Sequence, residues 1–475
     1  MNAPIPATQA PTRLHQAFER QKLAFAADRH PYLAARRDRL ERLLKLVTAH
    51  EGEFVAAVDR DFGHRSSQET RLAELYIVAA EARQALSQLH RWMRRRRVST
   101  PLHLWPASAW IERQPVGVVG VISPWNYPVQ LALAPVVGAL AAGNRVMLKP
   151  SEVTPATSAL LYDLIAGAFA EDELTVITGD ADVGRAFTHL PFDHLFFTGS
   201  TAVGREVAKA AAENLTPVTL ELGGKSPAIF DPDVDYTWTV PRLIVGKLLN
   251  AGQTCIAPDY ALVARSRVDE FVRVASDAIM RLYPSLATNP DYTTIVNDRH
   301  FSRLSGLIED ARAKGARIVP LGEPDAARRR LPPTLVVGVD DGMSVMREEI
   351  FGPVLPIETY GTLDEAIVRV NARPHPLAFY WFGTDAVRRD RALADTAAGG
   401  VTVNDTLWHF AHENLPFGGI GPSGFGAYHG ERSFLTFTHE KPIFEQGRIA
   451  AAALLRPPYG AMFERVLSLL RRLNA

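Results

Sequence analysis

A single cysteine is the most reactive side chain that this sequence offers. Cys255 lies in the run NAGQTCIAPD, where small residues precede it. A cysteine attacks a carbonyl carbon as the thiolate, so a catalytic cysteine needs a nearby base or surroundings that lower its pKa. Free cysteine is also among the residue types most often buried in a core. This run alone therefore leaves two interpretations open, a structural cysteine and a nucleophile.

Two further residues could assist such a thiol. Glu221 ends the apolar run PVTLEL, at the edge where an α/β sheet presents side chains to ligands, and could act as a general base. Asn126 follows another apolar run in ISPWNYP and could donate its amide N–H to an oxyanion. The alternatives are a surface carboxylate and an asparagine that satisfies its own turn.

Two other segments could bind a dinucleotide, and a third could line a pocket. FFTGSTAVG places Gly199 and Gly204 at a strand-to-helix turn, where free backbone N–H groups attract a pyrophosphate, although the spacing differs from G-x-G-x-x-G. LKPSE offers Lys149 and Glu152 to ribose hydroxyls. EEIFGP carries Phe351 beside a glycine, which could line a pocket. Packing glycines, a solvated ion pair and a packed loop are the ordinary alternatives.

The elements that position these residues alternate between strand and helix. Continuous apolar runs predict strands over 116–122, 145–149, 174–178, 194–199 and 217–222. Helices are predicted over 129–142, 155–169, from 182, and over 202–213, after a helical stretch from Leu14 to about Trp92. Strands buried on both faces and separated by helices are typical of a doubly wound α/β fold with a parallel sheet.

The second half predicts another α/β unit with its own sheet, over about 223–417. Its strands lie in LPPTLVVGV and FGPVLPIETY, and its helices span 268–282 and 301–314. From Gly418 the chain is glycine-rich and then extended over SFLTFTHEKPIFEQ. A final amphipathic helix is expected, and the first dozen residues are expected to be a disordered tail. The apolar face of that helix comprises Phe463, Val466, Leu467, Leu470 and Leu473.

The composition narrows the class of protein. Lys+Arg and Asp+Glu each number 52, so no net charge favours nucleic acid, and the basic run Arg94–Arg97 is more typical of a solvated face. One cysteine excludes an intrachain disulfide and favours a reducing cytosol. No signal peptide or membrane-spanning run is recognised, so we expect a soluble, cytoplasmic protein. No metal site is expected, because His409 and His412 lack the H-E-x-x-H arrangement.

In combination, these segments are similar to the aldehyde dehydrogenase superfamily, over about residues 14–441. The runs that carry the resemblance are PWNYP, LKPSE, FTGSTAVG, LELGGKSP, NAGQTCIAPD, EEIFGP and LPFGGIGPSG. GQTCIAPDY, VNDTLWH and GAYHGERSFLTFTH resemble the class 3 branch, and within it the bacterial coniferyl aldehyde dehydrogenase group. The resemblance implies a Rossmann-like cofactor domain, an α/β catalytic domain and a small oligomerisation element.

The resemblance also implies a role for each residue. Cys255 would be the nucleophile, Glu221 the base, and Asn126 with the Cys255 backbone N–H the oxyanion hole. The implied cofactor-binding residues are Lys149, Glu152, Gly199, Ser200, Gly204, Trp125, Glu349 and Phe351. The candidate pocket residues are Tyr127, Trp408, His409 and Phe410, some of which could instead belong to the core.

The implied reaction is the oxidation of an aromatic or medium- to long-chain aldehyde to the acid, through a cysteine thiohemiacetal and a thioester. NAD is favoured because Glu152 would repel a 2′-phosphate, although class 3 relatives also use NADP. A homodimer is expected, with a tetramer as the alternative. Other hypotheses are a coenzyme A-acylating enzyme, a fatty aldehyde dehydrogenase attached to a membrane by the final helix, and a non-enzymatic relative.

These expectations divide the chain into domains. The cofactor domain would comprise 1–97 and 115–222, and the catalytic domain 223–417. The oligomerisation element would comprise 98–114 and 430–446, followed by a tail helix over 447–475.

Overall fold

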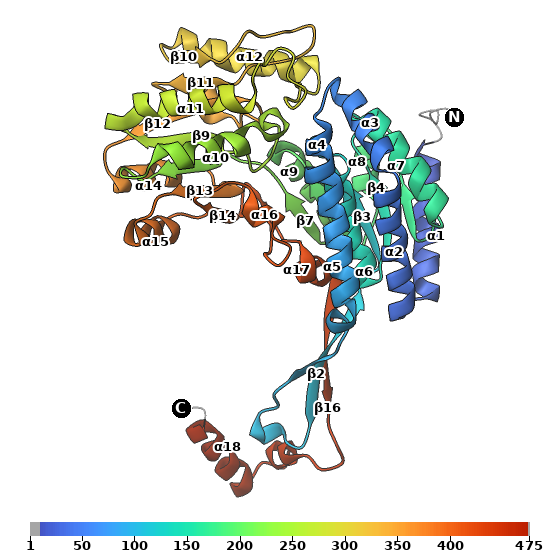
Figure 1. The fold of residues 1–475 in the computed structure, drawn as a ribbon. Coiled ribbons are helices and arrows are strands. Elements are labelled where there is room, and N and C mark those ends of the chain that lie inside the picture. The colour runs from blue at the N-terminus through green and yellow to red at the C-terminus, as the bar shows by residue number, and fades with distance from the viewer. Residues whose placement is uncertain (1–9, 474–475) are drawn as a thin grey trace.

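The structure is a computed structural model that describes residues 10–473. It confirms the α/β class, with a six-stranded sheet, a seven-stranded sheet and a three-stranded sheet in the described residues. Figure 1 shows the two larger sheets side by side and the smallest one extending away from both. The predicted disordered tail lies largely outside the described residues, and the first helix begins at Ala10.

The six-stranded sheet has the order β15-β7-β6-β3-β4-β5. Its strands are β3 (Val118–Ile122), β4 (Arg145–Lys149), β5 (Leu174–Val176), β6 (His194–Thr198), β7 (Val218–Glu221) and β15 (Gly424–Phe425). All pairs are parallel except β15, which returns from near the end of the chain to pair antiparallel with β7. The carboxyl ends of the parallel strands therefore share one edge, as the sequence predicts.

Helices cover both faces of this sheet. They are α1 (Ala10–Ala27), α2 (Leu33–Ala49), α3 (Glu51–Phe62), α4 (Ser67–Thr70), the π-helix η1 (Arg71–Tyr76), α5 (Ile77–Trp92), α6 (Gln130–Ala142), α7 (Pro155–Ala168), α8 (Ala181–Thr188), α9 (Thr201–Glu213) and α17 (Gly430–Thr436). α6 is buried along its whole length because it is apolar on every side and packs against α2 and α5.

The seven-stranded sheet has the order β10-β11-β12-β9-β8-β13-β14 and is parallel except for β10. Its strands are β8 (Pro227–Phe230), β9 (Tyr260–Ala264), β10 (Arg317–Pro320), β11 (Thr334–Val337), β12 (Val354–Tyr360), β13 (Ala378–Phe382) and β14 (Gly400–Val403). Its helices are α10 (Tyr236–Leu248), α11 (Val268–Leu282), α12 (Asp298–Ala313), α13 (Ser344–Arg347), α14 (Leu363–Asn371), α15 (Ala386–Asp395) and α16 (Trp408–Ala411), with the 3₁₀ turns η3 (Leu249–Gly252) and η4 (Arg265–Arg267). One cluster of buried apolar residues includes members of both large sheets, so their cores are continuous.

The three-stranded sheet forms an arm. It comprises β1 (Arg96–Val98), β2 (Ser108–Pro115) and β16 (Thr438–Glu445), with β2 in the middle and both pairs antiparallel. The turn η2 (Leu102–Leu104) contacts η5 (Ala451–Leu455), which precedes the final helix α18 (Ala461–Leu473). Figure 1 shows this arm and α18 well away from the large sheets.

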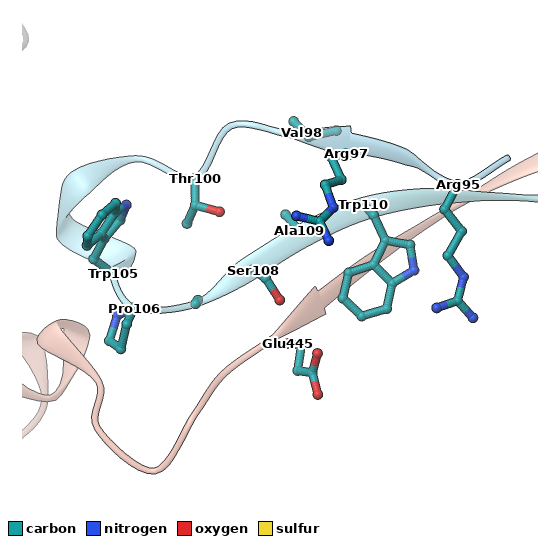
Figure 2. Close-up of a pocket in the computed structure, with 11 residues that line it drawn as sticks. Arg95, Arg97, Val98, Thr100, Trp105, Pro106, Ser108, Ala109, Trp110 and Glu445 are labelled. Atoms are coloured by element: carbon teal, nitrogen blue, oxygen red, sulfur yellow. The ribbon is translucent and has the colours of Figure 1, made fainter.

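A hollow of about 740 Å³ lies on the arm. Figure 2 shows Arg97 of β1, Trp110 of β2 and Glu445 of β16 around it. These strands lie apart from the large sheets that carry the predicted site residues, so this hollow is no candidate for the catalytic pocket.

One predicted element is wrong. The predicted domain boundaries are not tested and stay a prediction. The run SFLT, expected to be extended, lies in the helix α17. Phe434 packs against Trp92 with ring centroids 5.7 Å apart, so tertiary packing overrides the β-propensity of this run. In the rest of the run, β16 is extended as expected. Among residues 10–473, no helix has the length and apolarity needed to span a membrane.

Candidate active site

The loop that carries Cys255 reverses sharply after α10. Asn250, Ala251 and Gly252 have positive φ angles of 54°, 52° and 76°, an uncommon run for residues other than glycine. The Gln253 side chain holds this loop, because its Nε2 donates to the carbonyl oxygens of Asn250 and Thr294, each at 3.0 Å. The loop thereby presents a partly exposed Cys255.

Asn126 lies directly against this loop. Its buried side chain donates from Nδ2 to the carbonyl oxygen of Gln253 at 3.1 Å, two residues before the cysteine. The neighbouring Tyr127 hydroxyl lies 2.7 Å from Thr254 Oγ1, one residue before the cysteine. An amide nitrogen carries two hydrogens, so this bond leaves a second N–H of Asn126 for another acceptor. The structure therefore brings Asn126 and Cys255 together.

Glu221 occupies the end of β7, buried with 2% of its surface exposed. Neither carboxylate oxygen has a hydrogen-bond partner among the described residues, and burial raises the pKa of Glu221 well above its usual value. Burial also raises the pKa of Cys255 to about 12, with further contributions from Glu349 and Glu221, while the backbone N–H groups of Cys255 and Ile256 lower it. Both carboxyl groups therefore act electrostatically on the thiol.

Glu349 reaches the same place from another loop. A Cβ built on Gly223 would lie 2.1 Å from Glu349 Oε2, so only a glycine allows this carboxyl group to pack beside the end of β7. Burial, followed by Asp259, raises the pKa of Glu349 to about 8. Two of the carboxylates suggested by the sequence thus flank the cysteine loop.

Trp125 and Phe351 form one aromatic contact. Their ring centroids are 5.4 Å apart, and Trp125 also contacts His300 at 4.9 Å. Phe351 has a positive φ of 51° in the segment that follows Glu349. The structure therefore joins the segments PWN and EEIFGP, which are far apart in the sequence.

Lys149 and Glu152 lie together at the end of β4. Lys149 is buried, and its Nζ donates to the carbonyl oxygen of Pro150 at 2.9 Å and lies 3.5 Å from Glu152 Oε2. Burial lowers the pKa of Lys149, and Glu152 acts in the opposite direction. The Glu152 side chain is about half exposed, so its carboxylate faces solvent.

The glycines at the start of α9 have different surroundings. The Gly199 N–H donates to the Glu221 carbonyl oxygen at 3.0 Å, and Ser200 caps α9 by accepting from the Val203 N–H at 3.4 Å. Gly204 is buried, and an added Cβ would lie 2.6 Å from Leu222 Cδ2. Gly199 and Ser200 thus lie at the exposed helix N-terminus, whereas Gly204 allows the helix to approach β7 closely.

The four candidate pocket residues have different surroundings. Tyr127 is buried against the cysteine loop, whereas Trp408 is 63% exposed. His409 is buried and pairs through Nδ1 with Thr402 Oγ1 at 2.7 Å, and burial lowers its pKa to about 4. Phe410 packs against Phe417 with centroids 4.8 Å apart. His409 and Phe410 thus make packing contacts, and only Tyr127 bonds to the cysteine loop.

Sequence reasoning missed the buried charges that support this site. Lys225 pairs with Asp259 and donates to the carbonyl oxygens of Val345 and Glu348 at 2.9 Å. Asp259 Oδ1 in turn accepts from the Ile350 N–H at 2.9 Å, which holds the loop around Glu349. Lys225 lies in the motif GGKSP and Asp259 in the motif CIAPD. Their places in these two motifs were the only signal in the sequence that they could support the site. Among the described residues, no group of three metal-binding side chains occurs.

Comparison with known proteins assigns the chain to a family. Residues 5–443 match the family described as the aldehyde dehydrogenase family. A Pseudomonas aeruginosa protein named "Probable coniferyl aldehyde dehydrogenase" is 50% identical over 455 residues, which cover 96% of this chain and 95% of the relative.

Two solved structures have the same fold. Substrate-bound AldH of Staphylococcus aureus has a TM-score of 0.93 and 39% identity, covering 96% of this chain and 99% of that one. The indole-3-acetaldehyde dehydrogenase AldA of P. syringae, in complex with NAD⁺, has a TM-score of 0.84 and 26% identity, covering 92% and 89%. The chain belongs to the aldehyde dehydrogenase family and is an NAD(P)-dependent aldehyde oxidoreductase.

Proposed function

We propose that this enzyme oxidises an aromatic aldehyde to the carboxylic acid through a covalent intermediate on Cys255. The observation that carries the proposal is that Asn126 bonds to the loop of the only cysteine, while a buried Glu221 acts on the same thiol and has no hydrogen-bond partner within residues 10–473. Nucleophile, hydrogen-bond donor and base are the groups that acyl transfer from an aldehyde requires.

The residues present fit a dinucleotide cofactor. The exposed carboxylate of Glu152 beside Lys149 suits ribose hydroxyls, and the N-terminus of α9 at Gly199 and Ser200 suits a pyrophosphate. Glu349, with Trp125 and Phe351 beside it, would hold the nicotinamide end. When bound, the nicotinamide supplies the acceptor for the hydride that leaves the aldehyde carbon.

The protein residues then have defined tasks. Cys255 reacts as the thiolate, its proton having gone to solvent, and Sγ bonds to the aldehyde carbon. The second N–H of Asn126 and the Cys255 N–H donate to the developing oxyanion. After oxidation to the thioester, the Glu221 carboxylate takes a proton from water, whose oxygen attacks the thioester carbon, and its raised pKa makes it a stronger base than an ordinary carboxylate. The carbon–sulfur bond breaks, which releases the acid and restores the Cys255 thiolate, and Glu221 returns its proton to solvent.

The proposed substrate class is a coniferyl-like aromatic aldehyde. The relative named above, 50% identical along nearly the whole chain, supports this choice, and the aromatic Tyr127 beside the cysteine loop suits a flat ring. The exposed Glu152 supports NAD over NADP, because a carboxylate repels a 2′-phosphate.

The arm supports a homodimer. Val98, Trp105 and Phe444 are 42%, 59% and 51% exposed on or beside the three-stranded sheet. Apolar side chains in such a patch are stabilised by burial against another surface, and a second copy offers a matching one.

A panel of aromatic and long-chain aldehydes tests the proposal. Each aldehyde is assayed with NAD and with NADP, in the presence and absence of coenzyme A. We expect NADH formation from aromatic aldehydes without coenzyme A, with the free acid as product. A strict requirement for coenzyme A would instead identify an acylating enzyme, and inactivity with every aldehyde would contradict the proposed reaction.

A further inference from the structure

Three charged side chains contact the loops of Asn126 and Cys255, and of these Arg65 and Glu74 are buried and Glu69 is partly exposed. Arg65, Glu69 and Glu74 lie in the corner between α3 and α5, within or beside α4 and η1. The corner also contacts the segment beyond the cysteine loop, because Thr294 bonds to the carbonyl oxygens of Phe62 and His64. None of these three charges belongs to the catalytic or cofactor-binding groups described above.

Arg65 holds the backbone of the oxyanion donor. Its side chain is fully buried, and Nη1 donates to the carbonyl oxygen of Asn126 at 2.8 Å. The same nitrogen lies 3.2 Å from Glu74 Oε1. The guanidinium stacks 4.9 Å from the Phe62 ring and 4.7 Å from the Tyr127 ring, which fixes its plane.

Glu74 holds the other end of the same loop. Its Oε2 accepts from the N–H groups of Val129 at 2.6 Å and Gln130 at 3.2 Å, at the start of α6. Glu74 lies in the π-helix η1, a geometry that is rare and occurs mainly as single turns at functional sites. Arg65 and Glu74 therefore fasten the segment 126–130 at both ends.

Glu69 connects this loop to the cysteine loop. Its Oε2 accepts from the Asn250 N–H and from Thr293 Oγ1, each at 3.0 Å. Asn250 Nδ2 then donates to the same Asn126 carbonyl oxygen that Arg65 contacts, at 2.8 Å. The Asn126 carbonyl oxygen thus accepts from both Arg65 and Asn250, and so connects the segment of the oxyanion donor to the cysteine loop.

We propose that Arg65, Glu69 and Glu74 are positioning residues that set the distance between the Asn126 amide and Cys255. A buried ion pair adds little net stability, because desolvation offsets the attraction, whereas it does specify a geometry. A displacement of about 1 Å at a reacting group costs about 100-fold in rate, so fixing the Asn126 backbone has a direct effect on turnover. This inference rests on the proposed role of Asn126.

The test is a double-mutant cycle on the full-length enzyme. Arg65→Met with Glu74→Gln removes both charges of the ion pair at once, and Asn126→Ala removes the oxyanion donor. The cycle compares the rate of the NADH burst in wild type, in each variant and in their combination. Glu69→Gln and Arg65→Lys are additional variants, each of which changes only one of the three proposed positioning residues. The control removes an exposed pair from the same corner, Arg71→Met with Glu51→Gln, whose atoms are 2.7 Å apart.

We expect the buried-pair variant to lower the burst rate about 100-fold, with the KM for NAD within about twofold of wild type. In the Asn126→Ala background the same change should cost less than about threefold, because the geometry that it disturbs is already lost. The control pair should leave the rate unchanged. An undiminished 100-fold loss in the Asn126→Ala background would overturn the inference, and so would full activity of the buried-pair variant.

If the buried-pair variant does not fold, Glu69→Gln and Arg65→Lys carry the same cycle. A lower kcat at unchanged melting temperature supports positioning, and a parallel loss of both, without coupling to Asn126, contradicts it. Failure of the proposed function is distinct, because Asn126→Ala alone would then leave the burst rate at the wild-type value.

Discussion

The loops of Asn126 and Cys255 are held in place in the opposite way to the arm. The Asn126 and Cys255 loops are joined by buried side-chain bonds among segments that are far apart in sequence, and Gln253, Asn250 and Arg65 all take part. β16 is held to β2 by an eight-residue ladder, and none of its residues is buried. The residues proposed to place reacting atoms are built into the core, whereas the arm leaves its surface exposed.

The largest effect should come from the thiol itself. Cys255→Ala removes the atom that carries the covalent intermediate, so we expect kcat to fall by at least about 1000-fold. Cofactor binding, measured by quenching of protein fluorescence, should stay within about twofold, which shows that the loops remain assembled. Retention of wild-type turnover would contradict the covalent route. It would also contradict the view that the buried bonds around Cys255 serve catalysis.

The next effect should come from Glu221. Glu221→Gln keeps the shape but removes the base, so steady-state turnover should fall about 100-fold or more, while the first turnover still releases a burst of NADH. The burst amplitude is read by stopped-flow absorbance. A burst that disappears together with turnover would assign Glu221 to the attack step, and unchanged turnover would exclude it as the base.

The arm can be tested without touching the site. Phe444→Glu places a charge on the exposed face of β16, and burial of that charge in an interface should weaken association by about 30-fold or more, equivalent to about 2 kcal/mol. Light scattering on a size-exclusion column measures the mass as the protein is diluted. Leu23→Glu is the matched control, since Leu23 is 71% exposed on α1 of the main body. If both variants keep the wild-type mass, the arm is not the interface.

Cofactor choice should change more modestly. Glu152→Ala removes the exposed carboxylate that repels a 2′-phosphate, so the ratio of kcat/KM for NADP to that for NAD should rise about tenfold. Glu53→Ala on the exposed surface of α3 is the control and should leave the ratio unchanged. A ratio that does not move would remove Glu152 from the cofactor site.

The smallest effect concerns stability against pH. Burial raises the pKa of Glu349 to about 8, so this group keeps its proton in the folded state and loses it in the unfolded state above about pH 4.5. Its contribution to stability is therefore largest below pH 4.5 and is lost as the pH rises to 8. The melting temperature should fall less between pH 6.5 and 8 in Glu349→Gln than in wild type. Equal slopes would show that Glu349 is ionised throughout this range.

The order of strands and helices was predictable because each parallel strand of the six-stranded sheet lies in a continuous apolar run. β4 and α11 were predicted with the bounds that the structure has, and β3 and α6 within two residues. The helix α17 was not, since Phe and Thr favour strands and the packing of Phe434 against Trp92 depends on the tertiary structure. The antiparallel pairing of β15 with β7 could not be predicted either, because it joins Gly424 to Glu221, which are far apart in the sequence.

Some residues of the candidate site could likewise be predicted from the sequence, and others could not. Residues with uncommon chemistry in uncommon surroundings, such as the single Cys255 or Glu221 before two glycines, could be chosen from the sequence. Arg65, Glu69 and Glu74 could not, since charges at such spacing usually mark the solvated face of a helix. The pocket role of Trp408 stays a prediction, and its 63% exposure could not be read from the sequence, because the direction of a side chain depends on how α16 packs.

The sequence by itself therefore determined the α/β class, the order of the elements and the reactive groups, since apolar periodicity and residue chemistry are local properties. Only the tertiary structure decided which of these groups share one site. The turn of three left-handed residues before Cys255, the bond from Asn126 to Gln253 and the buried charges beneath them all depend on contacts between distant segments. Such contacts form when buried polar groups must find partners inside a folded core, a requirement that no local pattern records.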